Sequence, residues 1–345
     1  MYLPDQETGT FYKRILISTS RPLALILTFC ALMVPAAYAD TAKMPSLVFA
    51  SIEEGTTILA EPDEFVQRLS PFDRAARLKT KKDVSEAEYI YFVKRNVMNW
   101  SPSENALVEG AISELRPQLQ ALSLEWPRTI YLIKTSGKEE GGAAYTRGSA
   151  IVLPSVELVI GTQQSIRKII AHELFHILTR SNENLKERLY ASIGFHQCGE
   201  IAFPVKLRLV KITNPDAPKN DHCIRLTVAG RPTWAIPILY SHVAKYDEGR
   251  GGEFFDYLNA QFLLLDGNED RVPRNATYNE ANVRLVDIND VSGFLEQVGK
   301  NTDYVIHPEE ILADNFALLV QGESRVPSPE ILNRMRTVFE QARRK

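Results

Sequence analysis

The feature that most constrains this chain is a His-Glu-x-x-His pattern, formed by His172, Glu173 and His176 within an apolar segment of helical periodicity. Residues four apart lie on one face of an α-helix, so both histidines can direct a ring nitrogen to one metal ion. Apolar residues occupy nearly all sides of the segment, which predicts a buried helix over residues 162–180. Buried imidazole and carboxylate groups need partners, and a metal ion supplies one. The pattern also arises by chance, so a third ligand has to decide between the two interpretations.

Composition sets the class of protein and excludes some partners. The chain has 345 residues, of which 44% are hydrophobic and 24% are charged, as in a globular protein that can bury a large core. The formal net charge is −3 and there is no run of Lys and Arg. Neither nucleic acid nor an anionic membrane surface is therefore indicated as a partner. No pattern in the sequence indicates an oligomeric state.

Residues 1–39 have the pattern of a secretory signal peptide. Basic residues, including Lys13 and Arg14, precede an apolar stretch over residues 23–36, and Ala37, Tyr38 and Ala39 follow as an A-x-A cleavage site. The pattern predicts cleavage after Ala39 and a secreted or periplasmic protein. An uncleaved membrane anchor is the alternative. It is disfavoured because the apolar stretch is short and ends in small residues.

The cysteine content also bears on the compartment. Cys30 belongs to the predicted signal peptide, which leaves Cys198 and Cys223 in the mature chain. An oxidising compartment favours a disulfide between them, and its closure would stabilise the fold by about 3–4 kcal/mol on a chain-entropy estimate. Zinc ligation by the two thiolates is the alternative, made less favourable by the absence of a Cys-x-x-Cys pair.

Periodicity predicts helices before the His-Glu-x-x-His segment and a mixture of structures after it. The predicted helices cover residues 61–78, 84–100, 101–122, 182–193 and 307–319. The predicted strands cover residues 128–134, 143–153, 206–212, 224–228, 233–240 and 254–265. The last four strands define a β-rich insert over residues 203–266. Residues 40–140 are core-building helices or, alternatively, include a removable pro-segment, although no basic cleavage cluster marks its end.

The strand over residues 143–153 directly precedes the metal-motif helix. If this strand lies at an exposed sheet edge, it can bind an extended peptide by backbone hydrogen bonds, with Tyr145 and Arg147 near the site. An ordinary internal strand is the alternative.

A third metal ligand would lie downstream of His176. Thr179 and Asn182 stand where the metzincin pattern requires Gly and His, which excludes that class of zinc peptidase. The predicted helix over residues 307–319 carries Glu310 and Asp314, four apart and on one face. Here the chain resembles the gluzincins, the thermolysin-like branch of the zinc metallopeptidases, in which His-Glu-x-x-His is followed by Glu-x-x-x-Asp, often as Glu-x-x-Ala-Asp. Residues 310–314 have that form.

The resemblance implies a set of roles. His172, His176 and Glu310 would ligate Zn²⁺, Glu173 would be the general base, and Asp314 would orient a ligand histidine. Glu309 and His307 are rivals for the third ligand, but only Glu310 has an aspartate four residues later. Glu309 is expected to point about 100° away around the helix. Tyr240 and His242 are the candidates for stabilising the oxyanion.

The resemblance also implies a fold and a function. We expect an α+β, zincin-like catalytic domain over residues 40–345, with a small sheet, an active-site helix, a second ligand-bearing helix and the β-rich insert. The expected activity is zinc-dependent hydrolysis of peptide bonds in a peptide or protein substrate. Glu310 lies 134 positions after His176, so substrate specificity does not transfer.

Two other functions stay open. One is a zinc hydrolase of cell-wall peptide. The other is a non-enzymatic secreted protein with a structural or vestigial site, which a fourth protein ligand on the metal would favour.

Overall fold

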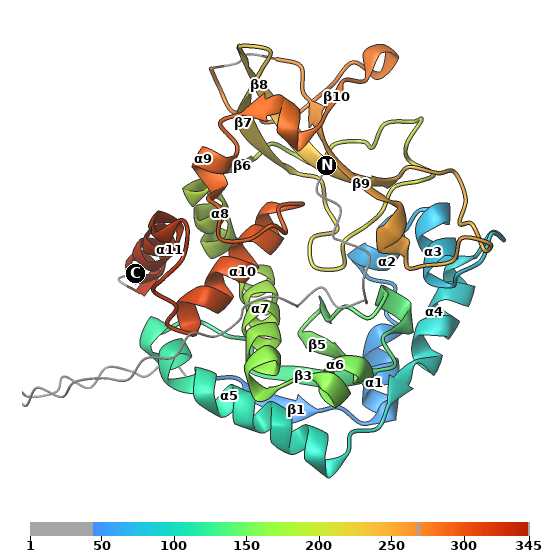
Figure 1. The fold of residues 1–345 in the computed structure, drawn as a ribbon, viewed down its shortest axis with the longest axis vertical. Coiled ribbons are helices and arrows are strands. Elements are labelled where there is room, and N and C mark those ends of the chain that lie inside the picture. Colours follow the sequence, from blue (N-terminus) through green and yellow to red (C-terminus); the bar gives the residue numbers. More distant parts are fainter. Residues whose placement is uncertain (1–43, 268–269, 344–345) are drawn as a thin grey trace, which may run out of the picture.

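The computed structural model describes residues 44–267 and 270–343. The predicted signal peptide, with Cys30, lies outside the described residues. The chain folds into helices and two separate sheets, with the metal-motif helix α7 (Gln163–Ser181) between them (Figure 1). The predicted α+β class is confirmed at this level.

The first sheet is mixed. Its order is β1 (Ser46–Phe49), β3 (Thr129–Thr135), β5 (Ala150–Pro154) and β4 (Tyr145–Arg147), and β2 (Val97–Met98) also pairs with β3. Strands β1, β3 and β5 are parallel, and the other two strands are antiparallel to their neighbours. Strand β5 is buried along its whole length, as expected for a strand covered on both faces. The single strand predicted over residues 143–153 is a hairpin instead. Gly148, with φ of 56°, makes the turn that splits it, and β4 becomes an antiparallel edge strand.

Helices flank this sheet. They are α1 (Ile52–Leu59), α2 (Glu64–Arg68), α3 (Pro71–Arg77), α4 (Glu86–Arg95), α5 (Pro102–Leu122) and α6 (Ser155–Ile160). The single helix predicted over residues 61–78 is broken, because the side chain of Ser70 caps a new helix that has Pro71 in its first turn. Helix α5 begins where predicted, with a capping box between Ser101 and Glu104.

Helix α7 is buried on nearly all sides, as predicted. It packs against α5 and against α10 (Pro308–Val320), while α8 (Glu183–Ser192) and α11 (Pro329–Arg343) complete the helical layer on that side (Figure 1). No helix in the described ranges is long and apolar enough to cross a membrane.

The second sheet is antiparallel and larger than the predicted insert. Its order is β10 (Leu285–Val286), β9 (Leu258–Leu264), β8 (Arg231–Ser241), β7 (His222–Val228) and β11 (Val291–Ser292), with β6 (Phe195–Gln197) beside β7 and helix α9 (Leu295–Val298) following β11. The strand predicted over residues 206–212 is wrong. Leu207 and Arg208 both donate backbone hydrogen bonds to Pro204, which makes a turn, and β9 begins only after a short 3₁₀ helix, Phe254–Tyr257.

Cys198 and Cys223 are buried in an apolar cluster against the second sheet. Cys198 follows β6 and Cys223 lies on β7. Both are free thiols, and Sγ of Cys198 donates a hydrogen bond of 3.4 Å to the carbonyl oxygen of Asp221. The paired strands bring both sulfurs to one place, and the disulfide between them stays a prediction.

Candidate metal centre

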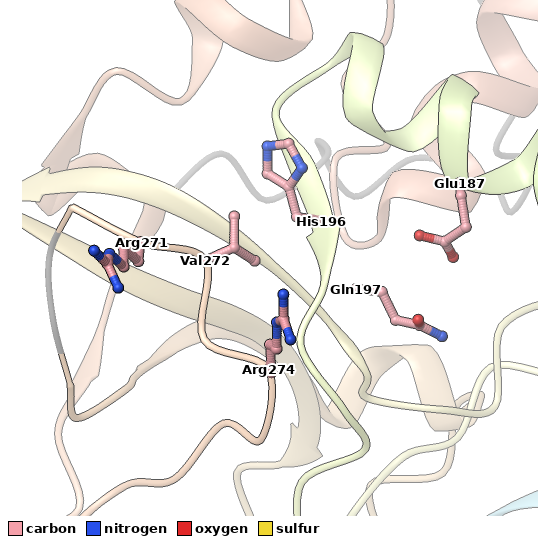
Figure 2. A pocket seen from close by; sticks show the side chains of 6 residues that line it. All are labelled: Glu187, His196, Gln197, Arg271, Val272 and Arg274. Atoms are coloured by element: carbon pink, nitrogen blue, oxygen red, sulfur yellow. The ribbon is translucent and has the colours of Figure 1, made fainter.

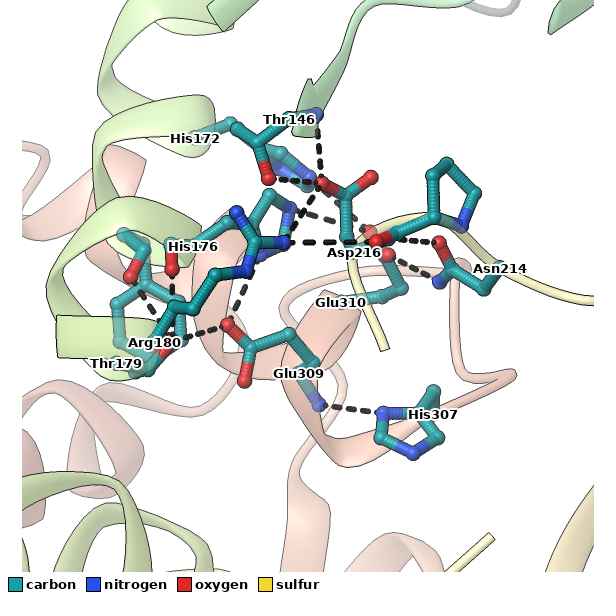
Figure 3. A network of polar contacts seen from close by, with 12 residues as sticks. Thr146, His172, His176, Thr179, Arg180, Asn214, Asp216, His307, Glu309 and Glu310 are labelled. Atoms are coloured by element: carbon teal, nitrogen blue, oxygen red, sulfur yellow. Dashed lines mark hydrogen bonds and ion pairs between the residues drawn. The ribbon is translucent and has the colours of Figure 1, made fainter. Parts of the chain in front are cut away.

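Helices α7 and α10 bring together the three residues predicted as ligands (Figure 3). Nε2 of His172 lies 3.1 Å from Oε2 of Glu310, and Nε2 of His176 lies 3.8 Å from the same oxygen. All three residues are buried. Donor atoms on one tetrahedral zinc ion, each about 2.0–2.2 Å from it, lie roughly 3.3 Å from one another. The three side chains are thus spaced as the ligands of one ion would be.

Asp314 lies where it can orient His172. Its Oδ1 is 3.0 Å from Nδ1 of His172, and Thr302 donates a hydrogen bond of 2.5 Å to its Oδ2. An ionised carboxylate only accepts hydrogen bonds, so Nδ1 of His172 carries the proton. With the Nδ1 proton held by Asp314, Nε2 of His172 would be the nitrogen that donates its lone pair to a bound metal ion.

Glu309 holds His176 in the same way, and the expectation that it points away from the site is wrong. Its Oε1 accepts hydrogen bonds from Nδ1 of His176 at 3.0 Å and from Thr179 at 2.5 Å, and its Oε2 accepts one from the hydroxyl of Tyr190. Each ligand imidazole needs a partner for the nitrogen that faces away from the metal. The sequence pattern predicted only one such carboxylate, Asp314, whereas the two histidines need two. His307 is not a ligand candidate here, because its Nδ1 caps α10 by accepting from the backbone N–H of Glu309 at 3.1 Å.

The donor set fits a divalent cation. Nε2 of His176 and Oε2 of Glu173 are buried and have no hydrogen-bond partner among the described residues. Buried polar atoms are rarely left without partners. Donor atoms of His172, Glu173 and His176 all lie within 4.8 Å of one another. Carboxyl groups outnumber the two imidazoles around this point; Glu173, Glu309 and Glu310 are buried, and Asp216 and Asp314 are partly buried. Nitrogen and oxygen donors of this kind suit zinc, and also Fe²⁺.

The electrostatics of the cluster also fit a divalent cation. Burial alone would lower the pKa of His172, but its hydrogen bonds with Asp314 and Glu310 outweigh burial and raise it. Burial opposes ionisation of Glu310, yet the nearby His176 and His172 lower its pKa to about 2. Burial, reinforced by the charge of Asp216, raises the pKa of Glu173 to about 8. A divalent cation beside Glu173 favours its ionised form, which is the form that can act as a base.

A further carboxylate reaches the site from a segment that sequence patterns did not single out. We call residues 213–216 the strap. The strap residue Asp216 has a carboxylate oxygen within 4.8 Å of the donor atoms of His176 and Glu310. The strap residue Asn214 donates a hydrogen bond of 2.5 Å from Nδ2 to Oε1 of Glu310 (Figure 3). An Asn-Pro-Asp sequence is typical of a turn, and no spacing rule relates it to the helix motif.

The structure does not bring the two oxyanion candidates to the centre. The Tyr240 hydroxyl donates to Oε1 of Gln261 at 2.5 Å. Nδ1 of His242 lies 2.9 Å from the carbonyl oxygen of Tyr257, and its Nε2 lies 3.2 Å from Arg250. Within the described ranges, neither side chain has a hydrogen bond to the residues of the metal centre. No oxyanion stabiliser is assigned.

One hollow in the structure is lined by none of the residues of the candidate metal centre. It has a volume of about 830 Å³ and is lined by Glu187, His196, Gln197, Arg271, Val272 and Arg274 (Figure 2). None of these residues belongs to the metal centre. A cavity of only about 10 Å³ adjoins the strap, with Thr213, Asn214 and His307 in its lining, which is room for about one water molecule. With the strap in this position, that cavity cannot admit a peptide side chain.

No protein-family model, curated protein or solved structure matches this chain.

Proposed function

We propose that the protein is a secreted or periplasmic zinc-dependent metallopeptidase of gluzincin type and zincin-like fold, with Glu173 as general base. One observation carries this proposal. Two imidazoles, each held by its own carboxylate, direct Nε2 toward the same region as Glu310, and the buried Glu173 beside them has an unpartnered oxygen.

His172, His176 and Glu310 would hold the ion. When bound, zinc supplies Lewis acidity that polarises the scissile carbonyl and acidifies water. Glu173 takes a proton from the attacking water and gives it to the leaving amine. Asp314 and Glu309 keep the protons on the two Nδ1 atoms and fix the ring orientations.

Strand β4 is the element best suited to bind an extended substrate. It is the edge of the first sheet and lies next to α7. Tyr145 and Arg147 are both buried, and Arg147 forms an ion pair of 2.5 Å with Asp63. The backbone of β4, rather than these two side chains, is therefore the part proposed to pair with a peptide.

A structural metal site in a non-enzymatic protein is the second candidate function. The position of Asp216 favours it, because four protein ligands leave no place for water. Glu173 argues against a structural site, since such a site does not require a buried carboxylate with an unpartnered oxygen.

Metal analysis and peptide hydrolysis distinguish the two functions. We expect about one zinc ion per chain, with hydrolysis of a mixed peptide library by wild type or by Asp216→Ala that stops on chelation and returns with zinc. Zinc binding without hydrolysis by either protein would support the structural site. Absence of any bound metal would overturn both proposals.

A further inference from the structure

Asp216 lies where a catalytic metal centre would need an open position. Its carboxylate shares a 4.8 Å cluster with the donor atoms of His176 and Glu310. A catalytic zinc ion has three protein ligands and keeps a fourth position for water or substrate. His172, His176 and Glu310 already supply three ligands. Asp216 is thus in reach of the fourth position.

The same carboxylate also covers the edge of the first sheet. Oδ1 of Asp216 accepts hydrogen bonds from the backbone N–H of Thr146 at 2.8 Å and from its hydroxyl at 2.5 Å (Figure 3). Thr146 is the middle residue of edge strand β4. An extended peptide pairs with a sheet edge through donors of this kind. One side chain therefore lies beside the candidate metal position and occupies a backbone donor of the sheet edge.

The strap is held by side-chain contacts rather than by a sheet or helix of its own. The backbone N–H of Thr213 donates to Oδ2 of Asp73 at 2.9 Å, and Arg77 donates to the carbonyl oxygen of Thr213 at 3.1 Å. At the other end, Arg180 of α7 donates to the carbonyl oxygen of Pro215 at 3.5 Å. A segment held in this way can move without unfolding a regular element.

We propose that Asp216 is a fourth protein ligand of the metal and that the strap holds the centre in a closed form. Displacement of the strap frees the metal position for water and the backbone of β4 for substrate. This inference rests on the proposed function and describes its regulation. The unpartnered oxygen of Glu173 favours a closed catalytic centre over a permanently structural one.

Cobalt-substituted protein tests the inference, because its visible absorption reports the ligands of the metal. The probe is acetohydroxamate, a small ligand that binds an open zinc-type site. The variant is Asp216→Ala, and the matched control is Asp83→Ala, whose side chain is 92% exposed and distant in sequence. We expect the cobalt spectra of wild type and Asp83→Ala to be insensitive to the probe. Asp216→Ala should bind the probe at least about tenfold more tightly and hold metal about 10- to 100-fold more weakly.

Asp216→Asn provides a second variant if the alanine variant does not fold. It keeps the size of the side chain and an oxygen for Thr146 but loses the charge, so it should bind the probe more tightly than wild type. Equal probe binding by wild type and a folded Asp216 variant, with metal present in both, would overturn the closed form alone. Failure of wild type to bind zinc or cobalt would overturn the proposed function as well.

Discussion

Glu309 accepts a hydrogen bond from Nδ1 of His176 at 3.0 Å, although the neighbouring Glu310 is the residue that faces Nε2 of the same ring. Two adjacent glutamates on α10, Glu309 and Glu310, therefore face the two nitrogens of one imidazole. The pair would allow one short helix both to ligate a metal ion and to orient another of its ligands.

Glu309→Ala should weaken zinc binding by about 10- to 100-fold, because His176 loses the acceptor that fixes its tautomer. It should also lower stability, since Tyr190 and Thr179 lose a buried partner. Competition with a chromogenic chelator measures the affinity, and urea denaturation measures the stability. Glu330→Ala, on the exposed start of α11, is the control. Unchanged zinc affinity in a folded Glu309→Ala would remove the orienting role.

Glu310→Ala should lose zinc more completely than any other substitution on α10, since it removes a ligand rather than a partner of one. Asp314→Ala should lie between this variant and wild type, with zinc affinity lowered about 10- to 100-fold. Metal content after gel filtration checks the order. Full zinc occupancy in Glu310→Ala would mean that the third ligand is another residue.

Glu173→Gln should bind as much zinc as wild type but should not hydrolyse peptides. Glutamine has nearly the same size as glutamate and cannot take a proton from water. Metal analysis and peptide hydrolysis are measured on the same preparation, in the Asp216→Ala background if wild type is closed. Near-normal turnover by this variant would show that another group is the base.

His222 should make stability depend on pH between neutral and alkaline conditions. Burial disfavours its charge, but hydrogen bonds with Asp221 at 2.6 Å and Glu187 at 2.8 Å raise its pKa from 6.5 to about 9. The folded-state pKa is above the unfolded one, so the stabilisation is complete below pH 6.5 and is lost as pH rises through about 9. The loss should be on the order of 3 kcal/mol. Urea denaturation at both ends of this range should show a weaker pH dependence for His222→Gln; parallel curves would contradict the assignment.

Cys198 and Cys223 should be linked in protein recovered from an oxidising compartment, because the pairing of β6 with β7 brings both thiols together. Mass spectrometry of unreduced peptides should detect the linked pair. Alkylation of both thiols without reduction would show that they stay free.

The parts of the centre that follow local rules could be predicted from the sequence. His172 and His176, and likewise Glu310 and Asp314, are four apart on helices, so each pair shares a face whatever the rest of the fold does. Glu309 and Asp216 could not be assigned in this way. The role of Glu309 depends on how α10 crosses α7, and that of Asp216 depends on a segment without periodicity.

The error over residues 206–212 has a related cause. Apolar residues alternate there, which favours a strand with one buried face. In the fold, Leu209 and the preceding Val205 are 59% and 54% exposed, so the alternation does not mark a buried face. Local pattern was insufficient because tertiary packing decides which apolar residues are covered.

Because Glu310 lies 134 positions after His176, the parts of the candidate centre are synthesised at different times. The two histidines leave the ribosome well before α10 is made, and the second sheet is synthesised in the interval. Until α10 emerges and docks on α7, the nascent chain lacks Glu310 and also Glu309 and Asp314, the two carboxylates that contact the imidazoles. The candidate metal centre would thus be completed among the last events of biogenesis, after most of the chain has been synthesised.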